Sequence, residues 1–210
     1  MSARSSAAIA ALLLAAAARK PTNAALRKAF ENNAQAVVEV VGPHKSGAGV
    51  VVGAGGQVLT SVDYVSLEEA TVKVAGQSFR AKVVVANADL KVAVVAVEVP
   101  PKAPDAPDAG APPAFRPPPV TLEETFVAGT ELVAIVRDQA GALAPRLVEV
   151  SRGRQATSPF VEVNAPLPNG TPLFDPQGRL VAMAVQRRKS SARALPVTEV
   201  KGQLARAASP

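Results

Sequence analysis

The sequence predicts an all-β protein made of two six-stranded antiparallel β-barrels, with one helix before the first barrel and one within the second domain. Three observations support this prediction. The chain has 210 residues, which is enough for two small domains. Its apolar residues are mostly Val, Ala and Leu, with no Trp and one Tyr, and β-branched side chains favour strands. Short apolar runs recur along the chain, and a Pro-rich stretch divides them into two groups.

The first 18 residues have the pattern of a secretory signal peptide. Arg4 precedes an apolar run over residues 7–18, and Arg19 and Lys20 follow it. The run is shorter than the roughly 20 residues needed to span a bilayer, and its final alanines suit a signal peptidase. We expect an exported protein, periplasmic or extracellular, without stable membrane insertion after cleavage. An uncleaved anchor is the alternative.

Residues 19–35 are predicted to contain an N-terminal helix that leads into the first barrel. Asn23 can cap this helix. Leu26, Ala29 and Phe30 fall on one of its faces, which is typical of an amphipathic helix.

The first barrel is predicted over residues 36–99. Residues 53–56 and 75–77 contain glycines between paired apolar runs, and glycine readily adopts the positive φ that tight hairpin turns require. We therefore predict a hairpin turn at each of these two places. The six predicted strands are residues 36–41, 49–52, 57–60, 70–74, 79–85 and 92–99.

Residues 100–119 are rich in Pro, Ala and Asp and contain few bulky apolar residues. This composition is typical of an extended linker. A linker of this kind also suggests that the two barrels are loosely coupled to each other.

The second barrel and a C-terminal helix are predicted over residues 120–210. Val197, Val200 and Leu204 share one face of that helix, which we expect to pack on the second barrel. The apolar runs that predict strands here are residues 131–136, 147–151, 160–163, 172–174 and 180–185.

The composition argues against several kinds of site. The chain has no cysteine and one histidine, so we expect no disulfide scaffold, no thiolate nucleophile and no metal site. Residues 53–56 precede a predicted strand rather than a helix, so they lack the helix N-terminus of a phosphate-binding loop. No cofactor is expected.

A glycine-rich run, Ser46–Val52, is followed after a turn by the run Gly56–Val65. Together they resemble the corresponding part of the trypsin-like serine proteases, and within that family the bacterial HtrA-type group. The resemblance covers about residues 36–205 and implies the double-barrel fold. The catalytic histidine of the family falls on Asp63, and a carboxylate does not relay the proton of a serine hydroxyl as an imidazole does. His44, the only histidine, is predicted to be an exposed loop residue.

The segment Ala88–Val95 resembles the family's strand that carries the triad aspartate. An ungapped comparison places Lys91 at the acid position, whereas a shift of two residues places Asp89 there. The sequence leaves both alternatives open. In either case the aspartate of the family orients a histidine, which this chain does not supply at Asp63.

The segment Leu167–Leu173 resembles the family's nucleophile loop, and Asn169 stands at the position of the serine. An amide side chain cannot form an acyl intermediate. Pro168 removes a backbone N–H from a loop whose amides should face the oxyanion. The resemblance therefore implies that Asn169, Gly170 and Thr171 are the remnant of an oxyanion loop.

Two later segments also fit the family. The segment Phe174–Met183 resembles the hairpin that follows the nucleophile. Arg193, Ala194 and Leu195, followed by Pro196, resemble a strand that lines the pocket for the residue before the cleaved bond. Because Arg193 replaces the family's phenylalanine, we predict that the inherited specificity is lost.

We therefore expect an exported trypsin-like protease homologue without a catalytic triad, a pseudoprotease that binds a protein or peptide partner. The fold and the site are separable, because barrel packing does not depend on the triad side chains. The alternative is an active endopeptidase with a misaligned site, in which Thr171 would be the attacking hydroxyl. The sequence specifies neither the partner nor an oligomeric state.

A third hypothesis, binding to a polyanion, comes from the net charge of +6. Proteins that bind single-stranded nucleic acids interleave aromatic with basic residues to stack the bases, and aromatic residues form only 3% of this chain. No nucleic-acid partner is therefore expected. The basic residues that motivated the hypothesis are Arg152, Arg154, Arg187, Arg188, Lys189 and Arg193.

Overall fold

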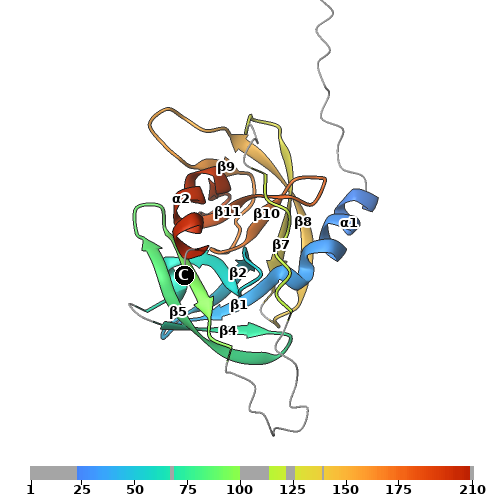
Figure 1. The fold of residues 1–210 in the computed structure, drawn as a ribbon. Coiled ribbons are helices and arrows are strands. Elements are labelled where there is room, and N and C mark those ends of the chain that lie inside the picture. Colours follow the sequence, from blue (N-terminus) through green and yellow to red (C-terminus); the bar gives the residue numbers. More distant parts are fainter. Residues whose placement is uncertain (1–22, 67–68, 100–113, 122–125, 139, 209–210) are drawn as a thin grey trace, which may run out of the picture.

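The computed structural model describes residues 23–66, 69–99, 114–121, 126–138 and 140–208. The predicted signal peptide and residues 100–113 of the predicted linker lie outside this part of the chain. Within it, two closed six-stranded antiparallel barrels stand side by side, as predicted (Figure 1). Their strand orders are β1-β2-β3-β6-β5-β4 and β10-β11-β12-β9-β8-β7.

The first barrel contains all six strands that the sequence predicts between residues 36 and 99. Both predicted hairpin turns are present, with a positive φ at Gly56 and Gly76. The strand bounds are β1 Val37–Val41, β2 Ser46–Val51, β3 Gln57–Ser61, β4 Glu69–Val74, β5 Gln77–Asn87 and β6 Val92–Val97.

The second barrel contains the five predicted strands and a sixth at the segment that resembles the pocket strand of the family. The strand β8 begins four residues earlier than predicted, because Pro145 and Arg146 interrupt the apolar pattern of its first half. The bounds are β7 Glu131–Arg137, β8 Leu143–Arg152, β9 Val161–Val163, β10 Pro172–Phe174, β11 Leu180–Arg187 and β12 Ala192–Pro196.

The N-terminal helix α1, Asn23–Asn33, packs against β7 and β8 of the second barrel although it precedes the first (Figure 1). Ala29 is buried, and the predicted apolar face contacts the core. The buried Asn33 amide donates to the carbonyl oxygens of Ala29 and Gly178, at 2.9 Å each. This side chain therefore fastens the end of the helix to the turn between β10 and β11.

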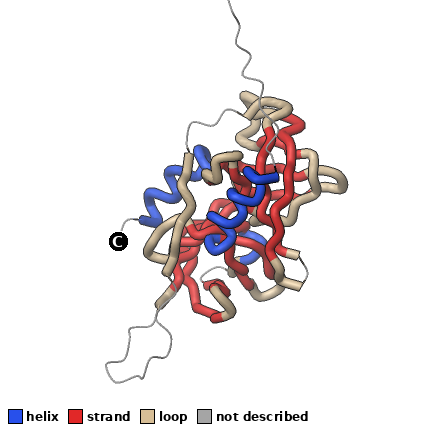
Figure 2. The backbone as a smooth tube through the Cα atoms, turned by 90° about the vertical axis from the view of Figure 1, so that its right-hand side faces the viewer, coloured by secondary structure: helices blue, strands red, loops and turns tan. Residues whose placement is uncertain are grey.

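The C-terminal helix α2, Val197–Ala208, contacts β11 and β12 of the second barrel, as expected, and also β5 and β6 of the first. Val197 and Val200 are buried in the core. Figure 2 shows the helices on the outside of the strands. None of the helices in the described residues is long and apolar enough to cross a membrane.

One apolar cluster passes from the first barrel into the second. Val50 and Leu59 belong to it on one side, and Ile135, Phe174 and Met183 on the other. A second cluster fills the rest of the second barrel. The continuous core argues against loose coupling of the two barrels, because separating them would expose these side chains to water.

The end of the predicted linker also contacts both barrels. Phe115 packs on the shared cluster beside Gly56, and Pro118 is buried. The Leu180 amide donates to the Pro119 carbonyl oxygen at 2.7 Å. Residues 114–119 are therefore part of the packed structure.

Replacing Phe174 tests the shared core. Phe174 is fully buried at the junction, so we expect Phe174→Ala to lower the free energy of unfolding by about 3–5 kcal/mol. Leu147→Ala is the control, because Leu147 is 43% exposed on β8, and its cost should stay below about 1 kcal/mol. Urea unfolding measures both values. Equal losses in the two variants would contradict the shared core.

Candidate functional site at the barrel junction

The positions predicted for the base and the nucleophile meet at the junction of the barrels. Asp63 lies in a short 3₁₀ turn, Val62–Tyr64, directly after β3. The Ser61 side chain holds this turn by accepting a hydrogen bond from the Asp63 amide at 3.3 Å. Asn169 lies in the loop between β9 and β10, and its Nδ2 donates to Oδ2 of Asp63 at 2.7 Å. The fold thus joins two residues that are 106 positions apart.

Asn169 makes further contacts on both of its sides. Its Oδ1 accepts a hydrogen bond from the backbone amide of Arg187, at the end of β11, at 2.9 Å. Its backbone oxygen accepts from the Tyr64 hydroxyl at 3.1 Å. The Asn169 side chain therefore links β11 with the turn that carries Asp63, and both ends of its amide are used.

The loop around Asn169 is pressed against the first barrel. Gly170 has a φ of +77°, and a Cβ placed on it would collide with the carbonyl oxygen of Ala48. Its amide donates to the Ala184 oxygen at 2.7 Å. Position 170 therefore requires glycine, both for its backbone angle and for the space.

The comparison with known proteins identifies the family. Residues 47–183 match the model of the trypsin-like peptidase domain. The chain belongs to this family. The trypsin-like double-barrel fold that the sequence resemblance implied is thereby confirmed. No curated protein matches the chain.

Solved structures of several proteases have a similar fold. The inactive form of the Rv3671c protease has a TM-score of 0.69 and 21% identity, and the match covers 90% of this chain and 98% of that one. The active form of the same protease, from M. tuberculosis, has a TM-score of 0.71 and 21% identity, over 91% and 89%. A serine endoprotease from Yersinia pestis has a TM-score of 0.68 and 20% identity, over 89% and 68%.

In a trypsin-like site, the oxyanion is held by the amide of the nucleophile and the amide two residues before it. If Asn169 stands at the nucleophile position, as the resemblance implies, the corresponding residues are Asn169 and Leu167. The Leu167 amide instead donates to the Ala165 oxygen at 2.9 Å. One of the two expected donors is therefore used within the loop.

Thr171 and His44 are the groups on which an alternative catalytic site would depend. Thr171 is fully buried, and its Oγ1 has no hydrogen-bond partner in the described part of the chain. His44 is exposed in the loop between β1 and β2, as predicted. The structure does not bring His44 into contact with Thr171.

Both candidates for the acid position, Asp89 and Lys91, are exposed in the turn between β5 and β6. The backbone oxygen of Lys91 accepts a hydrogen bond from the Val62 amide at 3.3 Å. Lys91 is thus the candidate whose backbone contacts the turn of Asp63.

The three residues predicted as a pocket remnant lie on β12 and point in different directions. Ala194 and Leu195 are buried in the core. Arg193 is half-buried, and its guanidinium lies 5.8 Å from the centre of the Phe160 ring, within cation–π range. Of the three, only Arg193 reaches the surface.

The basic hairpin after β11 is partly neutralised by Glu162 of β9. Glu162 accepts from Ser191 at 2.7 Å and from Arg188 at 3.1 Å. The Ser191 hydrogen bond, followed by the charges of Arg188 and Arg152, lowers the pKa of Glu162. Part of the basic cluster is therefore an internal ion-pair network. Among the described residues, no group of three His, Cys, Asp or Glu could hold a metal ion.

Gly170→Ala tests the close approach of the loop to the first barrel. The matched control is Gly76→Ala, because Gly76 has a similar φ of +82° but nothing lies within 4 Å of its Cβ position. Both variants should lose about 1–3 kcal/mol of unfolding free energy from backbone strain. Only Gly170→Ala should lose a further amount, of about 1–3 kcal/mol, from the collision. Equal losses in urea unfolding would show that the loop does not approach Ala48.

Tyr64 is the only tyrosine, so its ionisation can be followed by ultraviolet absorbance. Burial, and secondly the charge of Asp63, raises the pKa of Tyr64 above its ordinary value. The ionisation midpoint should exceed about 10 in the native protein and return to about 10 in concentrated urea. Because its folded pKa is raised, the neutral form of Tyr64 is favoured in the folded state and contributes to the free energy of unfolding. This contribution is complete below about pH 10 and is lost as pH rises through the folded pKa.

The variant Asp63→Asn separates the two causes. It removes the charge, so the midpoint of Tyr64 should fall, but it should stay above the unfolded value because burial is the larger cause. An unchanged midpoint would mean that Asp63 does not lie beside Tyr64 in solution.

Proposed function

We propose that this chain is a catalytically inactive trypsin-like protein, a pseudoprotease that serves as a protein-binding or scaffolding module. The observation that carries this proposal is the 2.7 Å hydrogen bond between Asn169 and Asp63. It lies where an active enzyme would pair its nucleophile with its base. The positions meet as they do in a protease, but the side chains present are an amide and a carboxylate.

These two side chains cannot carry out acyl transfer. A carboxylate is a much weaker base than an imidazole, and an amide nitrogen is not a nucleophile under these conditions. The bond is also stable in itself, because an N–H donor paired with a charged acceptor makes a stronger hydrogen bond than a neutral pair. Asn169 and Asp63 are therefore suited to joining the barrels rather than to cutting a peptide.

The state of the loop supports the same proposal. The Leu167 amide is bonded to Ala165, and the Arg187 amide at the end of β11 is bonded to Asn169. A peptide chain that adds to a strand needs free backbone groups on that strand. The Arg187 amide can meet such a peptide only after its bond to Asn169 opens, so we place the partner-binding surface on other faces of the barrels or on loops around this site.

We further propose that the protein acts outside the cytoplasm, in the periplasm or the extracellular space. The support is the N-terminal pattern of basic, apolar and small residues over positions 1–18. Expression in a bacterial host should give a periplasmic product that begins after residue 18, as measured by fractionation and intact mass. A full-length product in the membrane fraction would favour the uncleaved anchor.

A turnover assay tests the loss of catalysis. Because the base and the nucleophile are both replaced, the purified chain should hydrolyse neither casein nor a peptide ester above the rate without enzyme, and Thr171→Ala should behave identically. Cooperative urea unfolding of the same sample shows that it is folded. Hydrolysis that disappears in Thr171→Ala would establish the alternative, an active endopeptidase, and would overturn the proposal.

A further inference from the structure

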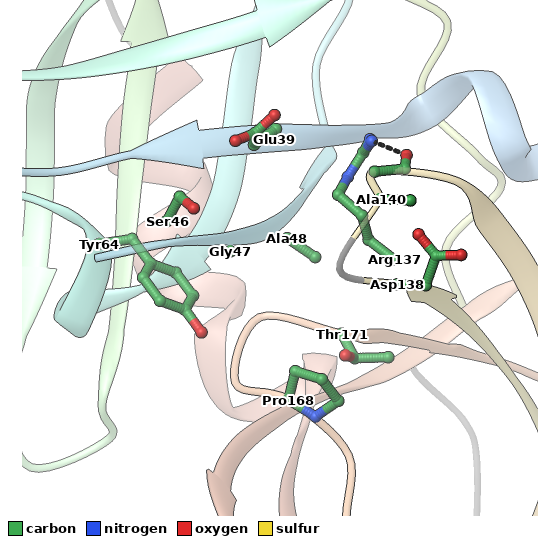
Figure 3. A pocket seen from close by; sticks show the side chains of 11 residues that line it. Glu39, Ser46, Gly47, Ala48, Tyr64, Arg137, Asp138, Ala140, Pro168 and Thr171 are labelled. Atoms are coloured by element: carbon green, nitrogen blue, oxygen red, sulfur yellow. Dashed lines mark hydrogen bonds between the residues drawn. The ribbon is translucent and has the colours of Figure 1, made fainter.

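A cleft lies beside the Asn169 loop, between the two barrels. We call it the side cleft, and its volume is about 380 Å³. The first barrel contributes β1, β2 and the Tyr64 turn, and the second contributes the β7–β8 turn and the Asn169 loop (Figure 3). The volume falls within the range of small-molecule pockets. The residues that matter here are Glu39, Ser46, Arg137, Asp138 and Thr171.

Two buried polar atoms of this lining have no partner. In the described part of the chain, three buried side-chain atoms lack a hydrogen bond, namely Oγ1 of Thr171, Nε of Arg137 and Oε2 of Glu131. The first two belong to residues that line the side cleft. Thr171 is fully buried. Buried polar groups in native proteins are nearly always bonded, so two such donors in one cleft indicate a ligand with acceptor oxygens.

Two hydrogen bonds fix the guanidinium of Arg137, and its Nε has no hydrogen-bond partner in the described part of the chain. Its Nη1 donates to the Gly141 oxygen at 2.6 Å (Figure 3), and its Nη2 donates to the Val37 oxygen of the first barrel at 3.3 Å. The guanidinium therefore spans both barrels. Because the other nitrogens are engaged, Nε is the donor that remains for a ligand.

Two carboxylates complete the lining. Glu39 pairs with Lys73 through Oε1 at 3.3 Å, and Asp138 accepts from the Ala142 amide through Oδ1 at 2.8 Å. Each carboxylate has a second oxygen, and an ionised carboxylate can accept several hydrogen bonds. With Arg137, the lining carries two negative charges and one positive charge. It therefore suits a ligand that combines an ammonium group with acceptor oxygens.

We propose that the side cleft binds the free amino end of a peptide or an amino acid. The ammonium group lies between Glu39 and Asp138, and the adjacent carbonyl or carboxylate oxygens accept from Arg137 Nε and Thr171 Oγ1. Low polarity around the buried donors strengthens these bonds. This binding requires neither the Asp63–Asn169 pair nor the loss of catalysis, so it goes beyond the proposed function.

Calorimetry with matched peptides tests the chemistry of the ligand. The probes are the dipeptide Ala-Ala, its N-acetylated form, free alanine, and an alanine-rich decapeptide with a free amino end. Acetylation removes the ammonium charge, so we expect it to weaken the affinity at least tenfold. Tight binding of alanine or Ala-Ala identifies a small ligand, and binding of the decapeptide alone identifies the N-terminus of a protein. Equal binding of the acetylated dipeptide, or no binding of any probe, would overturn the proposal.

The variant Thr171→Val tests the site itself. Valine keeps the shape of threonine but removes the hydroxyl, so the affinity for the tightest probe should fall at least tenfold. Because Oγ1 bonds to nothing in the free protein, the melting temperature without ligand should not fall. Ser46→Ala is the control, since Ser46 lines the same cleft with an exposed hydroxyl, and it should bind as the unchanged chain does. Unaltered binding by Thr171→Val would place the ligand elsewhere. These readouts are independent of the turnover assay.

Discussion

The structure depends on one apolar cluster that is shared by the two barrels. Val50 and Leu59 of the first barrel and Phe174 and Met183 of the second belong to it, and burial of this surface fixes the barrels against each other. The turn after β3 and the loop before β10 are attached to these same strands. Their separation is therefore set by core packing, and Asp63 and Asn169 come within hydrogen-bond distance as a consequence.

The core and the candidate site impose separate requirements on the sequence of this chain. The barrels keep a closed strand order and a continuous interior, which require buried Val, Leu and Ala but no particular side chain at position 63 or 169. Catalysis, in contrast, requires particular side chains at the positions of the base and the nucleophile, because proton transfer and nucleophilic attack are properties of single groups. A protein can therefore lose the chemistry and retain the geometry. The Asn169 amide, bonded to Asp63 and to the Arg187 backbone, uses that geometry to connect the barrels.

The Asn169 loop and the side cleft differ in how their polar groups are used. At Asn169, the amide and the neighbouring Leu167 N–H are satisfied within the protein. In the side cleft, the buried donors of Thr171 and Arg137 are not. Since an unpaired buried donor is unfavourable in the free protein, the side cleft is the place where a ligand has the most to contribute. The same lining combines a fixed guanidinium with two carboxylates, which favours a zwitterion over a simple ion.

The sequence by itself determined the architecture, and it singled out Asp63 and Asn169 as candidate site positions. Short Val-rich runs and glycine turns predicted the first-barrel strands, and local motifs located Asp63 and Asn169, because strand periodicity and turn chemistry are properties of neighbouring residues. Only the tertiary structure decided that α1 packs on the second barrel, that residues 114–119 are docked, and that Asn169 bonds to both Asp63 and Arg187. It also assembled the side cleft, whose Glu39, Arg137 and Thr171 belong to three separate segments. Such contacts join residues far apart in the chain, and they are set by the packing of the two barrels, which no local pattern encodes.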